Sequence, residues 1–213
     1  MQNFKRVVIL LSKTSGRDKS CRILQYFGKF CAEQLKELKQ DELSLKCKNL
    51  SSNMSLTRKV LRFGRTIGII ISIMELTKQK GNKAIILNKI LMNISCFLYF
   101  LVDHTHWFCK IQVIQNPQLE AKADYWSDAL WCFEAFFDCI ALILEIREEE
   151  NKSQDSKSSQ RLFNLKLDLL RAFMDLLSAY GFISNGRVPG KWIGFFGTIS
   201  SIIGLKQQWD AAK

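Results

Sequence analysis

The clearest alternation of apolar and polar positions runs from Leu56 to Glu75. At 100° per residue along a helix, its bulky apolar side chains recur every three or four positions and form one face. These residues are Leu56, Val60, Phe63, Ile67, Ile71 and Met74. The basic residues opposite them are Arg58, Lys59, Arg62 and Arg65. This pattern is typical of a helix in the membrane interface, although a core helix with a solvated basic face shows the same spacing.

Helical periodicity continues on both sides of this stretch. The segment Ser15-Gly-Arg-Asp18 has the spacing of a capping box, with Ser15 as the N-cap, ahead of an amphipathic helix. Residues 84–102 are nineteen mostly apolar positions, which rise about 28 Å as a helix and match a hydrocarbon core of roughly 30 Å. Residues 129–146 have a similar length. Each of these two segments is either a membrane span or a helix buried in a bundle.

The last apolar segment carries small residues at spacings of four, three, four and three. They are Gly190, Gly194, Gly197, Ser201 and Gly204. Such a helix-packing seam lets two helix backbones approach closely in a bilayer, whereas glycine is a poor choice for a soluble helix. We therefore predict a short or partly inserted membrane helix here.

These patterns predict an all-α, membrane-associated protein with amphipathic N-terminal helices and C-terminal hydrophobic helices. We expect four regions. Residues 1–80 form a basic amphipathic region, 81–147 hydrophobic helices that are candidate membrane spans, 148–161 a polar linker, and 162–213 a C-terminal helical pair with a glycine-rich membrane segment.

Charge is concentrated at one end of the 213-residue chain. Residues 1–80 hold 17 Lys and Arg against 6 Asp and Glu, so that they account for the whole net charge of +11. A basic block of this kind suits an anionic phospholipid membrane or nucleic acid. We favour the membrane, because the chain shows no nucleic-acid-binding motif. The seven cysteines have no metal-ligand spacing and indicate reduced thiols in a protein that is not secreted.

The chain offers little for catalysis, and we predict no enzyme, no cofactor and no metal. Asp103, His104 and His106 do not have a helical ligand spacing, and the chain has no further histidine. Glu134 and Asp138 lie four apart, without a nucleophile, a glycine-rich loop or a histidine partner nearby. They are the one sequence feature that favours a pore, because carboxylates within membrane helices mark ion paths.

Three blocks of the sequence carry a resemblance to known proteins. They are TSGRDKSCRILQYFGKF from Thr14 to Phe30, LTRKVLRFGRT from Leu56 to Thr66, and GFFGTISSIIGLKQQW from Gly194 to Trp209. YFLVDHTHW from Tyr99 to Trp107 is a weaker fourth. With these blocks the chain resembles the peroxisomal membrane protein 11 (peroxin-11) family over nearly its whole length. The resemblance implies a peroxisomal membrane protein that self-associates and engages the fission machinery, a dynamin-related GTPase and its adaptor. It also implies that Leu56–Glu75 inserts into the membrane.

We therefore predict a non-enzymatic protein that remodels and elongates the peroxisomal membrane through an amphipathic helix and promotes peroxisome proliferation and fission. The alternative is a peroxisomal membrane pore or metabolite channel that uses Glu134 and Asp138. A nucleic-acid binder is a third class, which release from membranes by carbonate would favour.

Overall fold

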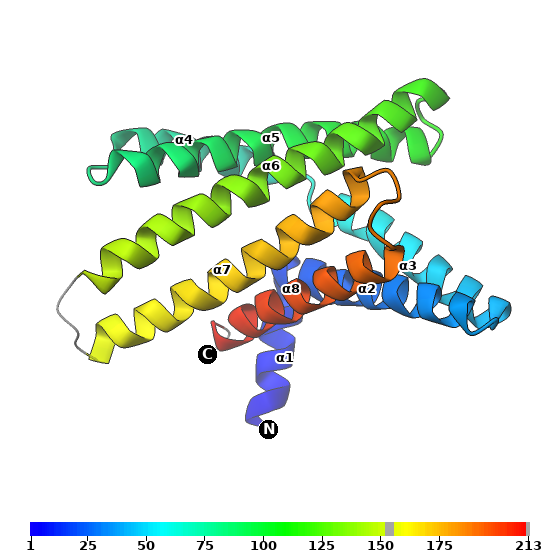
Figure 1. Cartoon of the computed structure of the whole chain (residues 1–213), viewed down its shortest axis with the longest axis horizontal. Coiled ribbons are helices and arrows are strands. Elements are labelled where there is room, and N and C mark those ends of the chain that lie inside the picture. The colour runs from blue at the N-terminus through cyan, green and yellow to red at the C-terminus, as the bar shows by residue number, and fades with distance from the viewer. Residues whose placement is uncertain (152–155, 212–213) are drawn as a thin grey trace. The chain divides into compact units, whose positions relative to one another are not determined.

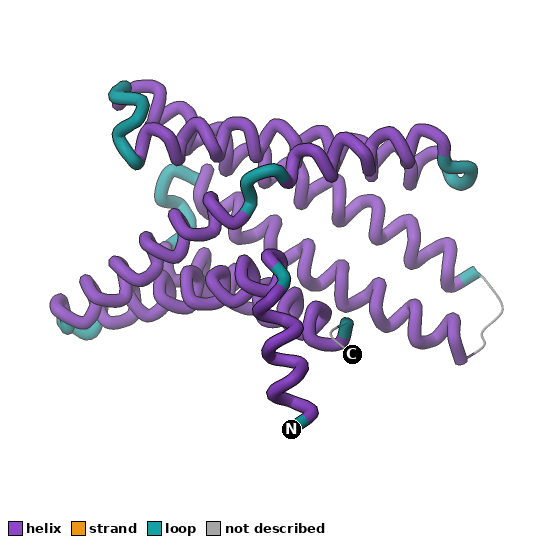
Figure 2. Tube along the Cα trace, turned by 180° about the vertical axis from the view of Figure 1, so that it is seen from behind, coloured by secondary structure: helices purple, strands orange, loops and turns teal. Residues whose placement is uncertain are grey.

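The computed structural model of the chain describes residues 1–151 and 156–211. These residues form helices and no strand (Figure 1, Figure 2). The helices are α1 (Gln2–Ser12), α2 (Thr14–Glu37), α3 (Asp41–Leu61), α4 (Arg65–Lys78), α5 (Lys83–Lys110), α6 (Pro117–Glu150), α7 (Ser156–Ile183) and α8 (Gly190–Asp210). The predicted all-α fold class is confirmed.

The helices group into two compact units. The terminal unit contains Met1–Phe63 and Gly181–Lys213, and the central unit contains Gly64–Tyr180. The terminal unit therefore holds α1, α2, α3 and α8, whereas the central unit holds α4, α5, α6 and nearly all of α7. This grouping differs from the four regions expected from composition, because α8 packs on α2 although the two lie at opposite ends of the sequence.

Helix α2 is the centre of the terminal unit, with α3 and α8 packed along it. Small residues let the helices approach. A Cβ at Gly28 of α2 would lie only 3.2 Å from the carbonyl oxygen of Cys47 on α3. A Cβ at Gly16 would overlap the backbone of Leu10, where α1 meets α2. The interhelical distances in this unit are therefore set by the absence of side chains at particular positions.

The central unit is built on the antiparallel helices α5 and α6, with α4 packed on α5. Local capping fixes where these helices begin. Asn82 accepts a hydrogen bond from the Ala84 amide (3.0 Å), and Asn116, just before Pro117, accepts one from the Leu119 amide (3.0 Å). Helix α7 packs on α6 through a cluster of apolar side chains. This cluster consists of Cys139, Leu142, Leu165, Leu169, Ala172 and Leu176.

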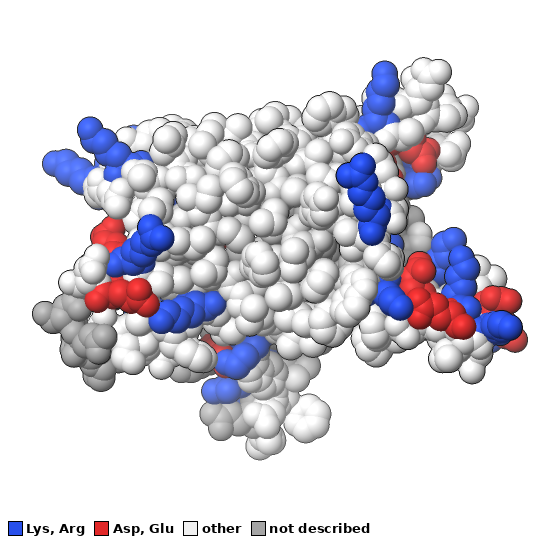
Figure 3. Space-filling model, viewed as in Figure 1, with Lys and Arg blue, Asp and Glu red and all other residues white. Residues whose placement is uncertain are grey.

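The central unit carries apolar side chains on its outside and charge between its helices. Large apolar residues are exposed on α5, α6 and α7. They include Leu87, Leu101, Phe133, Phe136, Leu170 and Phe173. On the face seen in Figure 3, the middle of these helices is covered by uncharged side chains, and charged ones lie toward the helix ends. Lys89 of α5 donates to Glu145 of α6, which joins the two helices by an ion pair. An apolar exterior with internal ion pairs is the arrangement expected in lipid.

In the part of the chain that the structure describes, α5 alone is long and apolar enough to cross a membrane. It extends the predicted segment 84–102 by one residue at the start and eight at the end. Residues 129–146 lie within the 34-residue α6.

Much of the predicted linker at 148–161 is helical. Helix α6 runs to Glu150 and α7 begins at Ser156, while residues 152–155 lie outside the described residues. Ion pairs join the two helices near these ends: Lys166 Nζ lies 3.0 Å from Glu150 Oε1. The described residues at both ends of the predicted linker thus continue the two helices.

Candidate membrane-contact site

The Leu56–Glu75 stretch is not one helix, and the prediction of a continuous helix is wrong. Helix α3 ends at Leu61 and α4 begins at Arg65. Gly64 between them has φ of +79°, a left-handed conformation that costs glycine little and that commonly ends a helix. The first part of the stretch belongs to the terminal unit and the part from Gly64 onward to the central unit.

The apolar residues of the stretch lie at the surface. Val60, Phe63, Ile67, Ile71 and Met74 each expose between 49 and 64% of their area, and Leu56 is half-buried. Large apolar side chains that gather at a protein surface mark contacts with a membrane or another protein. On α4, the exposed residues Ile67, Ile71 and Met74 follow one another at helical spacing.

The basic residues of the stretch are placed differently from the expectation of an exposed cationic face. Arg58, Lys59 and Arg62 are only 6–8% exposed, whereas Arg65 is exposed. Asp18 of α2 explains the burial of the two arginines. Its Oδ1 accepts hydrogen bonds from Arg58 Nε and from Arg62 Nε, both at 3.1 Å. A guanidinium group is buried at acceptable cost only when a counter-charge meets it, and Asp18 provides that charge.

The polar side chains that meet here recur at helical spacing along the chain. On α2, Asp18, Arg22 and Gln25 follow at spacings of four and three. Arg58 on α3 and Arg62, the C-cap of α3, are four apart. Gln25 Oε1 accepts a second hydrogen bond from Arg58, at Nη1 (2.5 Å). The guanidinium of Arg22 lies over the ring of Tyr26, 5.5 Å from its centroid. Charged side chains therefore join α2 to α3 inside the terminal unit.

A capping box with Ser15 as the N-cap and Asp18 reaching back was expected to begin α2, and this prediction is wrong. Helix α2 begins at Thr14 with Lys13 as its N-cap, and no side chain caps it. The Asp18 side chain points to α3 instead and is 2% exposed. Its charge also reaches Cys21. Burial raises the pKa of the Cys21 thiol, and the nearby Asp18 carboxylate raises it further.

The helix-packing seam of α8 lies against α2. A Cβ at Gly197 would overlap the Tyr26 ring, and one at Gly194 would lie 2.5 Å from the Phe30 amide nitrogen. Ser201 is fully buried. The ends of the seam meet charged side chains: Gly190 lies near Glu33, and Gly204 lies near Lys19. All five residues of the seam are thus turned inward within the terminal unit.

Comparison with known proteins identifies the family. Residues 4–209 match the Peroxisomal biogenesis factor 11 (PEX11) family. The chain belongs to this family. Peroxisomal membrane protein 11-1 of Oryza sativa subsp. japonica is 24% identical over 226 residues, which cover 95% of this chain and 90% of that protein. Peroxisomal membrane protein PMP27 of Saccharomyces cerevisiae is 22% identical over 97% of this chain and 94% of its own length.

Peroxisomal membrane protein 11C of Arabidopsis thaliana is 23% identical over 94% of this chain and 90% of its own length. No solved structure matches the chain. The family and these relatives place the chain in the peroxisomal membrane.

In this PEX11-family chain, the carboxylates that suggested a pore lie within a charge network. Asp138 Oδ2 is 3.4 Å from Arg171 Nη2 of α7. Arg171 also approaches Asp168 (3.5 Å) and Asp175 (3.7 Å) on its own helix. Glu134 is half-buried one turn before Asp138. The pair of Asp138 with Arg171 joins α6 to α7, which is a structural use of the Asp138 carboxylate.

The residues considered for a metal site are also placed within the central unit. Asp103 and His106 are buried on α5, and His106 Nδ1 lies 3.2 Å from Asp124 Oδ1 of α6. Among the described residues, no group of three His, Cys, Asp or Glu side chains could hold a metal. The contact between His106 and Asp124 joins α5 to α6 near the end of the pair opposite to Lys89.

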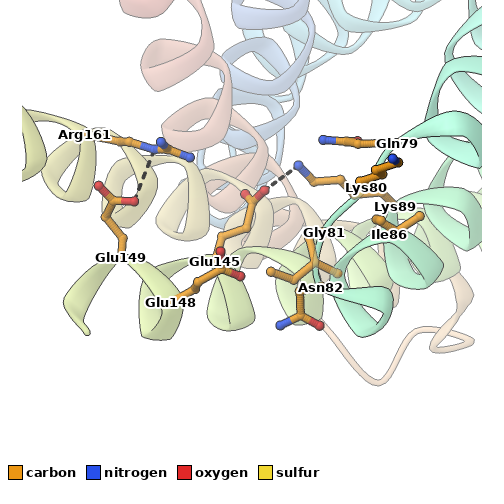
Figure 4. Close-up of a pocket in the computed structure, with 11 residues that line it drawn as sticks. Gln79, Lys80, Gly81, Asn82, Ile86, Lys89, Glu145, Glu148, Glu149 and Arg161 are labelled. Atoms are coloured by element: carbon orange, nitrogen blue, oxygen red, sulfur yellow. Dashed lines mark hydrogen bonds and ion pairs between the residues drawn. The ribbon is translucent and has the colours of Figure 1, made fainter. Parts of the chain in front are cut away.

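A small pocket of about 160 Å³ lies at the other end of α5 and α6 (Figure 4). The turn between α4 and α5 forms one wall with Gly81 and Asn82. Two ion pairs border it: Lys89 with Glu145, and Arg161 Nε with Glu149 Oε2 at 3.5 Å. The lining contains three basic and three acidic residues, so it carries no excess of either charge.

Proposed function

We propose that this chain remodels and elongates the peroxisomal membrane, without enzymatic activity, and so promotes peroxisome proliferation and fission. The observation that carries the proposal is the inverted polarity of the Leu56–Glu75 stretch. Its apolar residues are exposed while Arg58 and Arg62 are held inside by Asp18. In water this arrangement would leave a costly apolar surface. In a membrane protein the same surface has lipid as its partner.

Helix α4 is the part of the stretch best suited to act as a wedge. Its exposed residues include Ile67, Ile70, Ile71 and Met74, and it packs on α5, the helix long enough to span. Its 14 residues extend about 20 Å, so it is too short to cross a bilayer. An apolar helix held beside a spanning helix and inserted at the level of the head groups would spread one leaflet, and unequal leaflet areas bend a membrane.

The burial of most of these basic residues changes the role that we propose for positive charge in membrane binding. Arg65 is the exposed basic residue of the predicted membrane-binding set, and it stands at the start of α4, where it would meet anionic head groups. We assign Arg58 and Arg62 to holding α3 on α2, and Lys59 is buried beside them. Apolar insertion by α4, rather than a broad cationic face, is then the proposed source of curvature, while α5 holds the chain in the membrane.

Reconstitution tests the proposal directly. The full chain, inserted into vesicles of phosphatidylcholine and phosphatidylserine, should draw tubules from them, as seen by electron microscopy. A variant with Ile67, Ile71 and Met74 changed to Asn should stay in the vesicles through α5 and leave them round. Tubules of equal number from the variant would contradict the proposal.

Self-association and recruitment of a dynamin-related GTPase and its adaptor complete the proposed role. The family resemblance of the Thr14–Phe30 and Leu56–Thr66 blocks supports both. A pull-down of the GTPase with the full chain in vesicles, and chemical cross-linking between differently tagged copies, test these two interactions separately.

A further inference from the structure

Helix α1 presents a second exposed apolar face, separate from the Leu56–Glu75 stretch. Phe4 is 79% exposed and Val8 67%, and Val7 and Leu11 are also exposed. At 100° per residue these four side chains fall within an arc of about 100° on α1. Leu10, on another side of the helix, is buried and lies against Gly16. The face is therefore a continuous stripe on a helix whose other side is attached to the terminal unit.

The attachment of α1 leaves this stripe turned away from the terminal unit. Leu10 meets the start of α2, and the guanidinium of Arg6 lies 6.0 Å from the ring of Trp209 on α8. Beyond these contacts the helix extends outward from α2 and α8 (Figure 1, Figure 2). Intramolecular packing thus holds one side of α1, through Arg6 and Leu10.

Charge indicates what covers the stripe. Residues 1–17 contain the basic residues Lys5, Arg6, Lys13 and Arg17 and no acidic residue; the first carboxylate is Asp18. A cationic helix with a bulky apolar stripe has the composition of a helix bound at an anionic lipid surface. With 11 residues, α1 extends about 16 Å and is too short to span a bilayer.

We propose that α1 is an interfacial helix that binds an anionic phospholipid surface, with Phe4, Val7, Val8 and Leu11 among the acyl chains. Lys5 and Lys13 lie at the head groups. The terminal unit is thereby attached to the membrane at a point that does not depend on α4.

Site-specific photocross-linking tests this inference in the full chain. A benzophenone amino acid replaces Phe4 or Val8 on the stripe, or Ile9 on the other side of the helix as the matched control. Each protein is reconstituted into vesicles of phosphatidylcholine with phosphatidylserine, irradiated, and analysed by mass spectrometry. We expect lipid adducts at positions 4 and 8 in several-fold excess over position 9. Equal yields at all three positions, adducts mainly to a second copy of the chain, or no lipid adduct would each overturn the proposal.

Two further arms separate charge from apolar contact and α1 from α4. Lys5→Glu with Lys13→Glu should lower the adduct yield at position 4 in vesicles that contain phosphatidylserine and have little effect in phosphatidylcholine alone. In a chain that also carries Asn at positions 67, 71 and 74, the yield at position 4 should be unchanged. A yield that falls with the α4 changes would show that α1 has no separate attachment, whereas failure of tubulation alone leaves this inference standing.

Discussion

Asp18 and Arg62 lie 44 positions apart in the sequence and meet inside the terminal unit, with Arg62 Nε donating to Asp18 Oδ1 at 3.1 Å. Arg58 donates to the same oxygen atom. One carboxylate thus holds two guanidinium groups that the sequence pattern had placed at the membrane. Whether a basic residue here serves the membrane or the fold depends on its contact with Asp18.

Removing the Asp18 charge should destabilise the terminal unit. In Asp18→Asn two buried guanidinium groups lose their counter-charge, and breaking a buried pair typically costs about 3–5 kcal/mol in the free energy of unfolding. Thermal unfolding in detergent, followed by circular dichroism, measures the effect. Arg65→Gln is the control, because an exposed substitution usually changes this free energy by less than about 0.5 kcal/mol.

Asp18 and Arg65 should also differ in their effect on binding to anionic vesicles. Arg65→Gln should weaken binding to anionic vesicles, by about 1 kcal/mol for a basic residue near the surface, without affecting unfolding. Vesicle flotation at increasing phosphatidylserine content measures the binding. If Asp18→Asn left stability unchanged and strengthened anionic binding, the buried arginines would be membrane residues held in reserve, contrary to our assignment.

The close packing of the α8 seam predicts that a side chain added at Gly197 lowers the free energy of unfolding. Gly197→Ala places a methyl group into the Tyr26 ring, and overpacking of this kind costs about 1–3 kcal/mol in the free energy of unfolding. Gly68→Ala on α4 is the matched control, since a Cβ there meets nothing within 4 Å. Addition of Tyr26→Leu, with its smaller side chain, should recover part of the loss; no recovery would show that this ring is not what the methyl group meets.

The ion pair between α6 and α7 predicts the outcome of the pore alternative. Asp138 is engaged by Arg171. We therefore expect that the double variant Glu134→Gln with Asp138→Asn does not abolish any planar-bilayer conductance of the native chain. Asp168→Asn, on the same charge network, serves as the control. A conductance present in the native chain and in this control, but lost in the double variant, would establish a pore.

The thiol of Cys21 provides a pH-dependent test of the buried α2 face. Burial and the Asp18 charge both disfavour the thiolate, so its pKa lies above that of an ordinary cysteine. Alkylation of Cys21 should therefore reach half its maximal rate at a higher pH in the folded chain than in the denatured chain. Peptide-resolved mass spectrometry measures this rate, and coinciding pH profiles would mean that Cys21 is neither buried nor near Asp18.

The helical class was predictable because periodicity of apolar residues depends only on local spacing. The end of α3 was also signalled locally, since Gly64 follows its last turn, but the regular apolar positions on both sides of Gly64 obscured it. Sequence spacing found Gly194 and Gly197 on one face of α8. Their partner Tyr26 lies at the other end of the chain and is not specified by that spacing.

The role of the basic residues could not be predicted from spacing alone. A helix with one apolar and one charged face shows the same pattern whether water or lipid is outside, and only the direction of the faces differs. The role of Arg58 depends on Asp18 and Gln25, because their side chains determine which way Arg58 points. In a sequence they are indistinguishable from a solvated polar face.

The central claim is that the exposed apolar residues of α4 bend the membrane while Asp18 holds Arg58 and Arg62 within the fold. Counting tubules on vesicles by electron microscopy, at equal amounts of inserted protein, tests it most directly. The comparison is between the native chain, the variant with Asn at 67, 71 and 74, and a control with Ser72→Ala and Thr77→Ser on the same helix. We predict tubules from the native chain and the control and round vesicles from the Asn variant. Tubules from all three proteins, or none from the native chain, would contradict the account.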